Sequence, residues 1–284
     1  MVEEIDPGEL KRRVTSHWDR AAAPWDRWFE WYTVALRPLV EWSLDAAAVT
    51  AGSRVLDVAC GTGEPALTAA RRVGPGGSVL ATDIAPGMIA AASRRAHAAG
   101  LTNVRFAVMD AEALDVPDES FDACTFACGL MFCPEPARAL AGIRRALRSG
   151  GRFAISVWDH PRHNGFAMVF GRAVADVFGV PVPSAGALGP FRLADPDALA
   201  VLFRGAGFSS FDIESRPMVF QYDSIRHYLD ITTDFACGLE AKFDELSEDG
   251  RERFEALVVR SLAPHTVGGV VRLTATPLCV SGIV

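Results

Sequence analysis

Lysine is nearly absent from this chain of 284 residues, and positive charge is nowhere clustered. Only Lys11 and Lys242 occur, so almost all of the 28 basic residues are arginines. This scarcity argues against chemistry that needs a reactive lysine amine, such as a Schiff base. The 35 acidic residues give a net charge of −7 without any basic run, so we expect no nucleic-acid partner.

A cysteine framework is also lacking. The six cysteines form neither regular spacings nor a pair of C-x-x-C units, so we expect reduced thiols and no metal site. The first residues, MVEEIDPGELKRR, lack the apolar core of a signal peptide, and no later apolar run approaches the ~20 residues of a membrane helix. These absences predict a soluble cytoplasmic protein without a membrane span.

The middle of the chain alternates short apolar runs with stretches of helical period. Strands that alternate with helices predict a parallel sheet covered on both faces, with right-handed crossovers. We therefore expect an α/β, doubly wound fold. The expected strands are 53–59, 77–82, 103–108, 121–127 and 151–158, and the helices between them are 65–73, 86–99 and 135–148.

The flanking segments divide the chain into three parts. Residues 1–48 hold five of the six tryptophans, and we expect an N-terminal helical lid in which Pro24 separates two helices. Residues 49–158 form the alternating core that would bind a cofactor. Residues 159–284 are expected to complete the core sheet and to cap the substrate site.

Two segments of the last part are expected to form that cap. Segment 159–194 reads as a loop with one helix, and segment 223–264 reads as a helical insertion before a last strand at 270–280. The chain stays apolar to its end, so residues 278–284 predict either pairing in the sheet or a contact in a homodimer.

A glycine-rich turn follows the first expected strand. Gly61 and Gly63 let a ligand approach the backbone closely, and the helix that starts near Pro65 offers unpaired N–H groups. This junction predicts a nucleotide-cofactor site. Residues 61–66 also satisfy the dinucleotide pattern G-x-G-x-x-A, and Asp83 lies 20 residues beyond Gly63.

Three further segments distinguish a cationic cofactor from a dinucleotide. Asp57 precedes the glycines and would repel a pyrophosphate but attract a cation. Residues 110–112, Asp-Ala-Glu, end the third expected strand, where a carboxylate and a backbone amide suit the edge of an adenine ring. Residues 117–122, PDESFD, lead into the fourth strand.

Together these segments resemble the class I S-adenosylmethionine-dependent methyltransferases over roughly residues 15–158. The matching motifs are D-V-A-C-G-T-G, the acid after the second strand, D-A-E-A-L and P-D-E-S-F-D. VLDVACGTGEPAL, DIAPGMIAAA and FCPEPARAL are similar to the small-molecule branch near the ubiquinone/menaquinone-biosynthesis C-methyltransferases and bacterial natural-product methyltransferases. The resemblance implies a Rossmann-like sheet, mostly parallel with an antiparallel last strand. It also implies S-adenosyl-L-methionine as the cofactor and S-adenosyl-L-homocysteine as its product.

The resemblance assigns the methionine end of the cofactor to two strand ends. The backbone of Gly61 and Gly63 would pass beside the methionine part, with Asp57 on its ammonium side. Carbonyl groups around Ala127 and Cys128 would meet the ammonium group.

The adenosine end is assigned in the same way. Asp83 would accept hydrogen bonds from the ribose hydroxyls, and Asp110 would accept one from the adenine amino group. The Ala111 amide would donate to the adenine ring, and Met88 would pack on it. The full set expected to bind the cofactor is Asp57, Ala59, Gly61, Gly63, Asp83, Ile84, Met88, Asp110, Ala111, Ala127 and Cys128.

A catalytic base is needed only if the nucleophile carries a proton, because an in-line displacement at the sulfonium methyl otherwise requires only alignment and exclusion of water. His160, His163 and His227 are the candidates for this role. Their sequence context is equally consistent with surface histidines.

Aromatic residues are expected on the substrate side. Trp158 and Tyr228 are candidates for acceptor contacts, and Trp25 and Trp28 are candidates for a lid over the cofactor. Aromatic residues at helical spacing more often pack in a core, so that alternative stays open for the N-terminal tryptophans.

The sequence thus predicts a methyltransferase that moves a methyl group to a small, aromatic or lipid-like metabolite. An NAD(P)-dependent oxidoreductase would explain the G-x-G-x-x-A pattern, but no lysine lies between Lys11 and Lys242 to complete a Tyr-x-x-x-Lys pair. A cofactor-binding module without turnover would keep the same pocket and is the third hypothesis.

Overall fold

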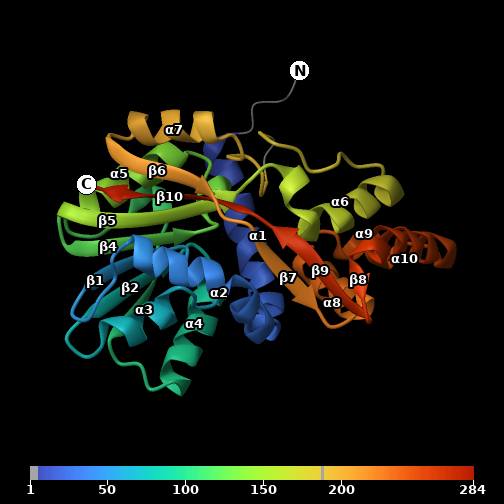
Figure 1. Cartoon of the computed structure of the whole chain (residues 1–284), viewed down its shortest axis with the longest axis horizontal. Helices are drawn as coiled ribbons and strands as arrows, with labels where there is room; N and C mark the ends of the chain where they lie inside the picture. The colour runs from blue at the N-terminus through green and yellow to red at the C-terminus, as the bar shows by residue number, and fades with distance from the viewer. Residues whose placement is uncertain (1–5, 187–188) are drawn as a thin grey trace.

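The computed structural model describes residues 6–186 and 189–284. Its larger sheet lies in the order β3-β2-β1-β4-β5-β10-β6, and β10 runs antiparallel to both of its neighbours while the first five strands are parallel (Figure 1). The mostly parallel, doubly wound sheet with an antiparallel last strand is confirmed. Its strands are β1 (Arg54–Val58), β2 (Ser78–Asp83), β3 (Val104–Val108), β4 (Phe121–Ala127), β5 (Leu147–Trp158), β6 (Ser210–Ser215) and β10 (Pro277–Ile283).

Helices cover both faces of this sheet, which is why the central strands are apolar throughout. Figure 1 shows α3 (Ala66–Val73) and α4 (Pro86–Ala98) on one face, and α5 (Pro136–Ala146) and α7 (Pro196–Gly205) on the other. Helix α2 (Phe29–Ala46) packs on β4 and β5. Helices α4, α5 and α7 each begin with a proline. N–H groups in the first turn of a helix have no hydrogen-bond partner within that helix, so proline, which lacks this group, is favourable there.

The run 270–280 is not one strand, as its continuous apolar pattern predicts, but two. Strand β9 (Val270–Ala275) pairs with β7 (Met218–Tyr222) and β8 (Thr266–Val267) in a separate antiparallel sheet. Between β9 and β10, the Thr276 N–H donates to Asn164 Oδ1 at 2.8 Å, and the Thr276 carbonyl accepts from the Asp159 N–H at 3.0 Å. These bonds fix the residue at which the chain passes from the small sheet to the large one.

The small sheet and its helices stand beyond the carboxyl ends of the large sheet (Figure 1). The helical insertion expected before the last strand is present, and within the described residues no helix is long and apolar enough to cross a membrane. The helices of this part are α6 (Gly165–Phe178), α8 (Ile225–Phe235), α9 (Glu240–Asp244) and α10 (Glu248–Leu262). Short 3₁₀ turns occur at Ala111–Ala113, Leu130–Phe132, Pro161–His163 and Ala263–His265.

Helix α1 (Pro7–Arg27) crosses the middle of the molecule and packs on α4. The Gly87 N–H donates to Asp19 Oδ1 at 2.8 Å, and a Cβ at position 87 would lie 2.8 Å from the Ala22 Cβ, so the absent side chain permits the close approach. The break expected at Pro24 falls instead at Trp28, because a hydrogen bond from the Trp28 N–H to the Pro24 carbonyl continues the helix past the proline.

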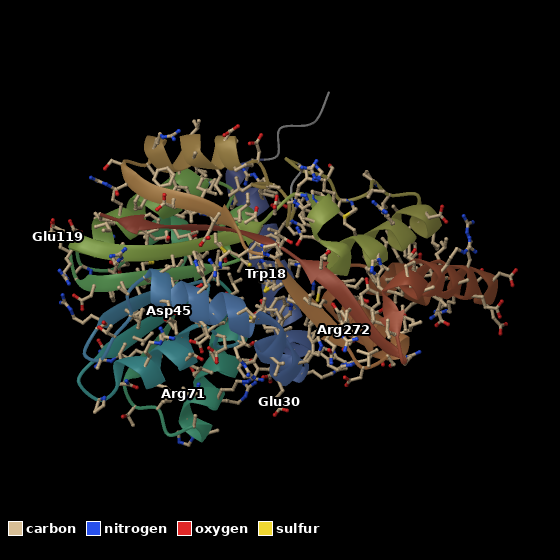
Figure 2. All side chains as sticks on the ribbon, viewed as in Figure 1. Trp18, Glu30, Asp45, Arg71, Glu119 and Arg272 are labelled. Carbon is tan, nitrogen blue, oxygen red and sulfur yellow. The ribbon has the colours of Figure 1, made fainter. Side chains whose placement is uncertain are left out.

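Helix α1 lies beyond one end of the large sheet. Glu119, which precedes β4, lies at the outer end of the sheet, whereas Trp18 on α1 lies near the middle of the molecule, beyond the opposite end (Figure 2). The carboxyl ends of parallel strands are where open α/β sheets bind ligands. Helix α1 therefore lies over the expected site.

Candidate functional site

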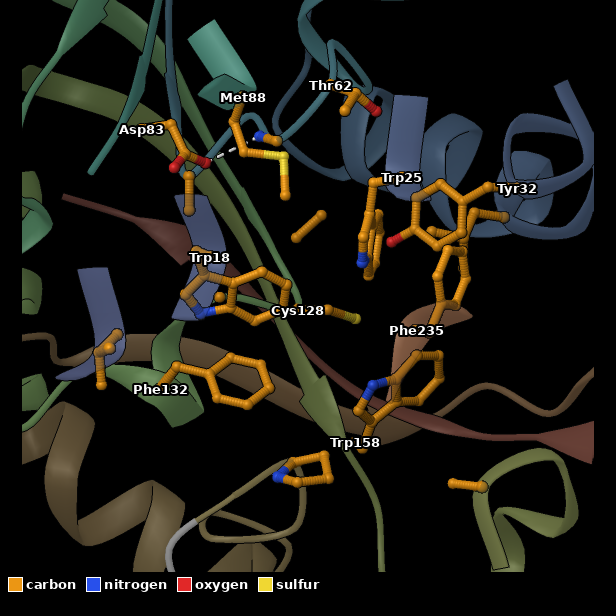
Figure 3. Close-up of a pocket in the computed structure, with 18 of the residues that line it drawn as sticks. Trp18, Trp25, Tyr32, Thr62, Asp83, Met88, Cys128, Phe132, Trp158 and Phe235 are labelled. Carbon is orange, nitrogen blue, oxygen red and sulfur yellow. Dashed lines mark hydrogen bonds between the residues drawn. The ribbon is translucent and has the colours of Figure 1, made fainter. Parts of the chain in front are cut away.

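A cavity of about 570 Å³ lies between the carboxyl ends of β1, β2 and β4 and the helices α1, α2, α6 and α8. Figure 3 shows Thr62, Asp83 and Met88 at one side of it, and Phe132, Trp158 and Phe235 at the other. Nine of the expected cofactor residues line it, together with Trp25 and Trp158: Ala59, Gly61, Asp83, Ile84, Met88, Asp110, Ala111, Ala127 and Cys128.

The loop after β1 forms one wall of the cavity. Ala59 and Gly61 both have a left-handed backbone, with φ of 52° and 53°. The Gly61 N–H donates to Asp83 Oδ2 at 2.9 Å, and no atom lies within 4 Å of the place where a Gly61 Cβ would be. The loop therefore presents bare backbone to a ligand, and glycine is the residue that adopts this conformation without strain.

Asp83 connects this loop to the end of β2. Its Oδ1 accepts the Ala85 N–H and its Oδ2 accepts the Gly61 N–H, each at 2.9 Å. Only 7% of the residue is exposed, and that surface faces the cavity. Burial raises the pKa of the carboxyl group above its usual value. Each oxygen keeps a lone pair, so the pair of them can accept hydrogen bonds from two hydroxyls of a ligand.

Asp57 and Gly63 are expected at the cofactor but do not line the cavity. Asp57 is fully buried under the loop, where Oδ1 accepts the Thr125 hydroxyl at 2.6 Å and Oδ2 has no partner among the described residues. Burial raises the pKa of Asp57 to about 8. A Cβ at Gly63 would lie 2.6 Å from Leu67 Cδ1, so this glycine lets the loop pack on α3 rather than touch a ligand.

Three carboxyl groups thus surround the loop; Glu64 Oε1 lies 3.9 Å from the Arg71 guanidinium group, and no ion pair holds Asp57 or Asp83 among the described residues. Burial raises the pKa of Asp57, Glu64 and Asp83, and mutual repulsion contributes at Asp57. A cationic ligand would stabilise the ionised forms, whereas a pyrophosphate would be repelled. The residues therefore fit a cofactor that carries positive charge, as S-adenosylmethionine does.

A second set of carboxylates lies at the end of β3. Asp110 Oδ1 accepts the Glu112 N–H at 2.9 Å, and Asp110 Oδ2 pairs with Lys11 Nζ at 2.6 Å. Lys11 also lies 2.6 Å from Glu112 Oε2. Helix α1 is thereby connected to the segment that the resemblance assigns to adenine, and Lys11 lines the cavity there.

Cys128 begins the turn after β4, directly opposite the loop of β1. Its φ of 52° places a non-glycine residue in the left-handed region, and its N–H is held by the carbonyl and the hydroxyl of Ser156 at 3.0 and 3.1 Å. Burial raises the pKa of the Cys128 thiol to about 12, so the thiol stays protonated. Ala59 and Cys128 are both strained, and both line the cavity, as residues at ligand sites often do.

Aromatic side chains dominate the rest of the wall. The Trp25 ring stacks on Phe235 with centroids 4.8 Å apart and meets Tyr32 edge-on at 4.4 Å. Trp158 packs on Phe166 at 4.8 Å. Further apolar members include Leu36, Leu39, Val40, Phe126, Phe132, Phe170, Val174, Phe220, Ile231 and Leu239. This half of the cavity suits an apolar, aromatic ligand.

The three candidate histidines are not part of the described lining. His160 caps a 3₁₀ turn by accepting the Arg162 N–H at its Nδ1, and His163 Nδ1 lies 2.9 Å from Asp159 Oδ2 on a half-exposed ring. His227 accepts the Asp223 N–H at 3.1 Å. Each imidazole thus takes part in the local structure of its own loop or helix, away from the cavity.

Trp28 and Tyr228 also lie elsewhere. The Trp28 indole donates to Asp234 Oδ2 at 2.7 Å, which connects α1 and α2 to α8. The Tyr228 hydroxyl is buried, donates to the Phe166 carbonyl and accepts the Phe170 N–H, each at 3.0 Å. Both side chains hold the helices that surround the cavity, and neither lines it.

Sequence reasoning does not single out several polar residues of the lining, among them Lys11, Tyr32, Thr62 and Tyr222. The scarcity of lysine directs attention away from Lys11, although one of only two lysines in an arginine-rich chain is itself a signal. Tyr32 was not singled out, although it follows Trp25 by seven residues and so shares its face of the helical segment. Ion pairs with Asp110 and Glu112 place Lys11, and packing against Phe235 of the distant α8 places Tyr32. No local pattern encodes those contacts.

Comparisons with known proteins agree with this geometry. A family model described as a methyltransferase domain matches residues 55–151. Aklanonic acid methyltransferase DauC of Streptomyces sp. (strain C5) is 39% identical over 153 residues, which is 54% of this chain and 68% of that protein. Demethylmenaquinone methyltransferase of Thermus thermophilus is 36% identical over 179 residues, 59% of this chain and 79% of that protein.

Solved structures share the fold. The YcgJ protein from Bacillus subtilis aligns with a TM-score of 0.55 and 19% identity, over 88% of this chain and 97% of the other. The [4+2]-cyclase SpnF aligns with a TM-score of 0.54 and 23% identity, over 87% of this chain and 80% of the other. At these identities the likeness concerns the fold alone.

Proposed function

Since the chain belongs to the S-adenosylmethionine-dependent methyltransferases, enzymes of EC 2.1.1 type, we propose that it methylates a small aromatic or lipid-like metabolite held in the apolar half of the cavity. One observation carries the proposal. A single cavity joins the carboxylates and bare backbone that suit the cofactor to a wall of aromatic side chains that suits an apolar acceptor.

The chain's own residues would hold the cofactor as follows. Asp83 accepts the ribose hydroxyls, Asp110 accepts the adenine amino group, and Met88 packs against the ring. Gly61 gives the methionine part access to backbone. Asp57 lies beneath the loop and does not reach the cavity, and its carboxyl group, kept protonated by burial, would ionise more readily beside a cationic cofactor.

When bound, S-adenosylmethionine would supply a methyl group activated by a positively charged sulfur, and neutral S-adenosylhomocysteine would be the leaving product. The protein's task is to align the acceptor with this methyl group and to exclude water. Trp25, Phe235 and Trp158 restrict where a flat acceptor can lie, and α1 covers the site from the N-terminal side. Residues 1–48 then act as the lid of a core at 49–158, and residues 159–284 supply the cap.

The oxidoreductase alternative gains no support. The G-x-G-x-x-A pattern is present, yet the loop it forms is surrounded by the carboxyl groups of Asp57, Glu64 and Asp83, which offer a dinucleotide pyrophosphate no positive charge and repel it wherever they are ionised.

Turnover tests the proposal. The purified protein is incubated with S-adenosylmethionine and a panel of flat phenols, enols and aromatic acids, and S-adenosylhomocysteine and methylated products are followed by mass spectrometry. Formation of both in equal amounts, only with an acceptor present, supports the proposal. Methylation restricted to polar aliphatic acceptors in a wider panel would contradict the acceptor class.

A further inference from the structure

The tryptophans of the described chain fall into two groups according to the partners of their indole N–H groups. Trp28, Trp31 and Trp42 donate within the protein, to Asp234 Oδ2 at 2.7 Å, to the Gln221 carbonyl at 2.8 Å and to Glu214 Oε1 at 3.1 Å. Trp18, Trp25 and Trp158 line the cavity, and no described residue accepts a hydrogen bond from any of these three indoles. An indole N–H in a protein interior normally has an acceptor, and these three have none within the described residues.

The Trp158 nitrogen is accessible from the cavity. The residue is only 8% exposed, yet its nitrogen is not among the solvent-inaccessible polar atoms that lack a hydrogen-bond partner, which in the described residues include Thr33 Oγ1 and Asp57 Oδ2. A ligand oxygen can therefore reach Trp158 Nε1 where protein atoms do not.

A further donor lies beside Trp25. The Tyr32 hydroxyl has no hydrogen-bond partner among the described residues, and its ring is held against Trp25 and Phe235. Burial raises the pKa of Tyr32 well above its usual value, so the hydroxyl is a proton donor and not a base. Tyr32, Trp25 and Trp158 surround the space next to Cys128 in Figure 3.

The same half of the cavity offers no group to take up a proton. The lining carboxylates Glu64, Asp83, Asp110 and Glu112 all belong to the cofactor end. Among the other described lining residues, the Thr232 hydroxyl already donates to the Tyr228 carbonyl at 2.7 Å, and the Cys128 thiol stays protonated. The three candidate histidines lie outside. An alcohol or an ammonium group would find nothing here to deprotonate it.

From this arrangement of donors without a base, we propose that the acceptor enters the site with its own oxyanion, a carboxylate, phenolate or enolate. Trp25 Nε1, Trp158 Nε1 and the Tyr32 hydroxyl bind this oxyanion. The inference rests on the proposed function and specifies its substrate class. The oxyanion, or the carbon conjugated to it in an enolate, forms the bond to the methyl group with an electron pair that is already free, so no proton has to be removed by the enzyme.

An anion bound in this cavity also needs a positive charge nearby. Transfer of an anion into an apolar site is costly unless hydrogen bonds and a nearby cation compensate it. The lining's cation, Lys11, is engaged by Asp110 and Glu112 at the adenine end. The positive charge on the cofactor is therefore the one available to an anion at the transfer site, and an anion should bind better beside a cationic cofactor than beside a neutral one.

Isothermal titration calorimetry tests the proposal without turnover. The protein is first saturated with sinefungin, a stable analogue that carries an ammonium group in place of the sulfonium methyl. It is then titrated with 2-naphthoate, with ionised 2-hydroxy-1,4-naphthoquinone and with neutral 2-acetylnaphthalene, whose shape matches that of the first probe. We expect at least one anion to bind about tenfold more tightly than the ketone, as hydrogen bonds to a charged group imply. A higher affinity for 2-naphthoate would indicate a carboxylate acceptor, and a higher affinity for the ionised naphthoquinone would indicate an enolate acceptor.

Replacing sinefungin by neutral S-adenosylhomocysteine should weaken the anion severalfold and leave the ketone unchanged. The variants Tyr32→Phe and Trp158→Phe should each reduce the preference for the anion, while the ketone's Kd stays within about twofold. Trp42→Phe is the control, because that indole donates to Glu214 outside the cavity. Unchanged affinity for S-adenosylhomocysteine shows that each variant is folded.

The proposal is overturned if neither anion binds more tightly than the ketone, if neither anion binds at all, or if the variants weaken all probes equally. In each case the proposed function survives as long as S-adenosylhomocysteine still binds. If that ligand does not bind, the proposed function fails as well.

Discussion

The ammonium group of Lys11 on α1 lies 2.6 Å from the buried carboxylate of Glu112, which follows β3. The Glu112 side chain is 1% exposed, and its other oxygen accepts the Glu135 N–H at 2.8 Å. Because Lys11 also pairs with Asp110, one side chain connects the N-terminal helix to the adenine end of the cavity. This contact ties the proposed lid to the segment that follows β3.

Replacing Lys11 by methionine should therefore loosen α1. The change leaves the buried Glu112 carboxylate without its cation, and we expect the free energy of unfolding to fall by about 1–3 kcal/mol. Urea unfolding measures this directly. Arg12→Met is the matched control, because Arg12 is exposed and its ion pair among the described residues is with Glu9 in the same helix. Equal stabilities of the two variants would show that Lys11 does not secure the helix.

Asp83→Ala should weaken the binding of S-adenosylhomocysteine by roughly 100-fold, because two hydrogen bonds from ribose hydroxyls to a charged acceptor are lost. Calorimetric titration gives the affinity, and circular dichroism checks the fold. Asp118→Ala serves as a control, since that carboxylate is 69% exposed and pairs with Arg145. An Asp83→Ala protein that is folded and binds with unchanged affinity would remove Asp83 from the site.

Asp57 should give the protein a pH-dependent stability. Its pKa is about 8 in the folded protein against 3.8 for the ordinary group, so between these values the unfolded chain releases a proton that the folded chain keeps. The contribution of Asp57 to stability is then greatest below about pH 4, falls by about 1.4 kcal/mol per pH unit above it, and levels off above about pH 8. Thermal unfolding from pH 5 to pH 9 should show the decline.

Asp57→Asn is neutral at every pH, so the decline should become shallower in this variant. It should not vanish, because burial also raises the pKa values of Glu64 and Asp83. A wild-type protein whose stability rises from pH 5 to pH 8, or a variant with an unchanged slope, would contradict the assignment.

The three histidines should be dispensable for methyl transfer. Loss of a general base typically costs 10²–10⁴-fold in rate, whereas we expect His160→Gln, His163→Gln and His227→Gln each to retain kcat within about twofold. The assay uses the first acceptor that the turnover panel identifies. A hundredfold loss in one variant, with S-adenosylhomocysteine affinity unchanged, would restore that histidine as the base.

Most of the residues proposed to bind the cofactor could be predicted from the sequence to lie together, because each follows directly from the end of a strand. Asp83, Asp110 and the glycines each follow a strand, and parallel strands bring their carboxyl ends together whatever the rest of the chain does. The role of Asp57 was harder to predict, because sequence places it near the loop but does not reveal that its side chain points beneath it.

The acceptor half could not be predicted in the same way. It forms where α1, α2 and α8 meet, and the ring of Phe235 stacks on Trp25 across 210 residues of chain. Sequence periodicity places both Trp25 and Trp28 on the N-terminal helices and does not distinguish them. The packing of α8 does: Trp25 lines the cavity, whereas the Trp28 indole donates a hydrogen bond to Asp234. The split of 270–280 between two sheets likewise depends on Asn164 and Asp159, which are distant in sequence.

Calorimetric titration of the purified protein with S-adenosylhomocysteine, and separately with NAD and NADP, tests the central claim most directly. We predict micromolar or tighter binding of S-adenosylhomocysteine and no measurable binding of either nicotinamide cofactor. Binding of NAD or NADP alone would contradict the assignment of the glycine loop, the carboxylates around it and the cavity they share.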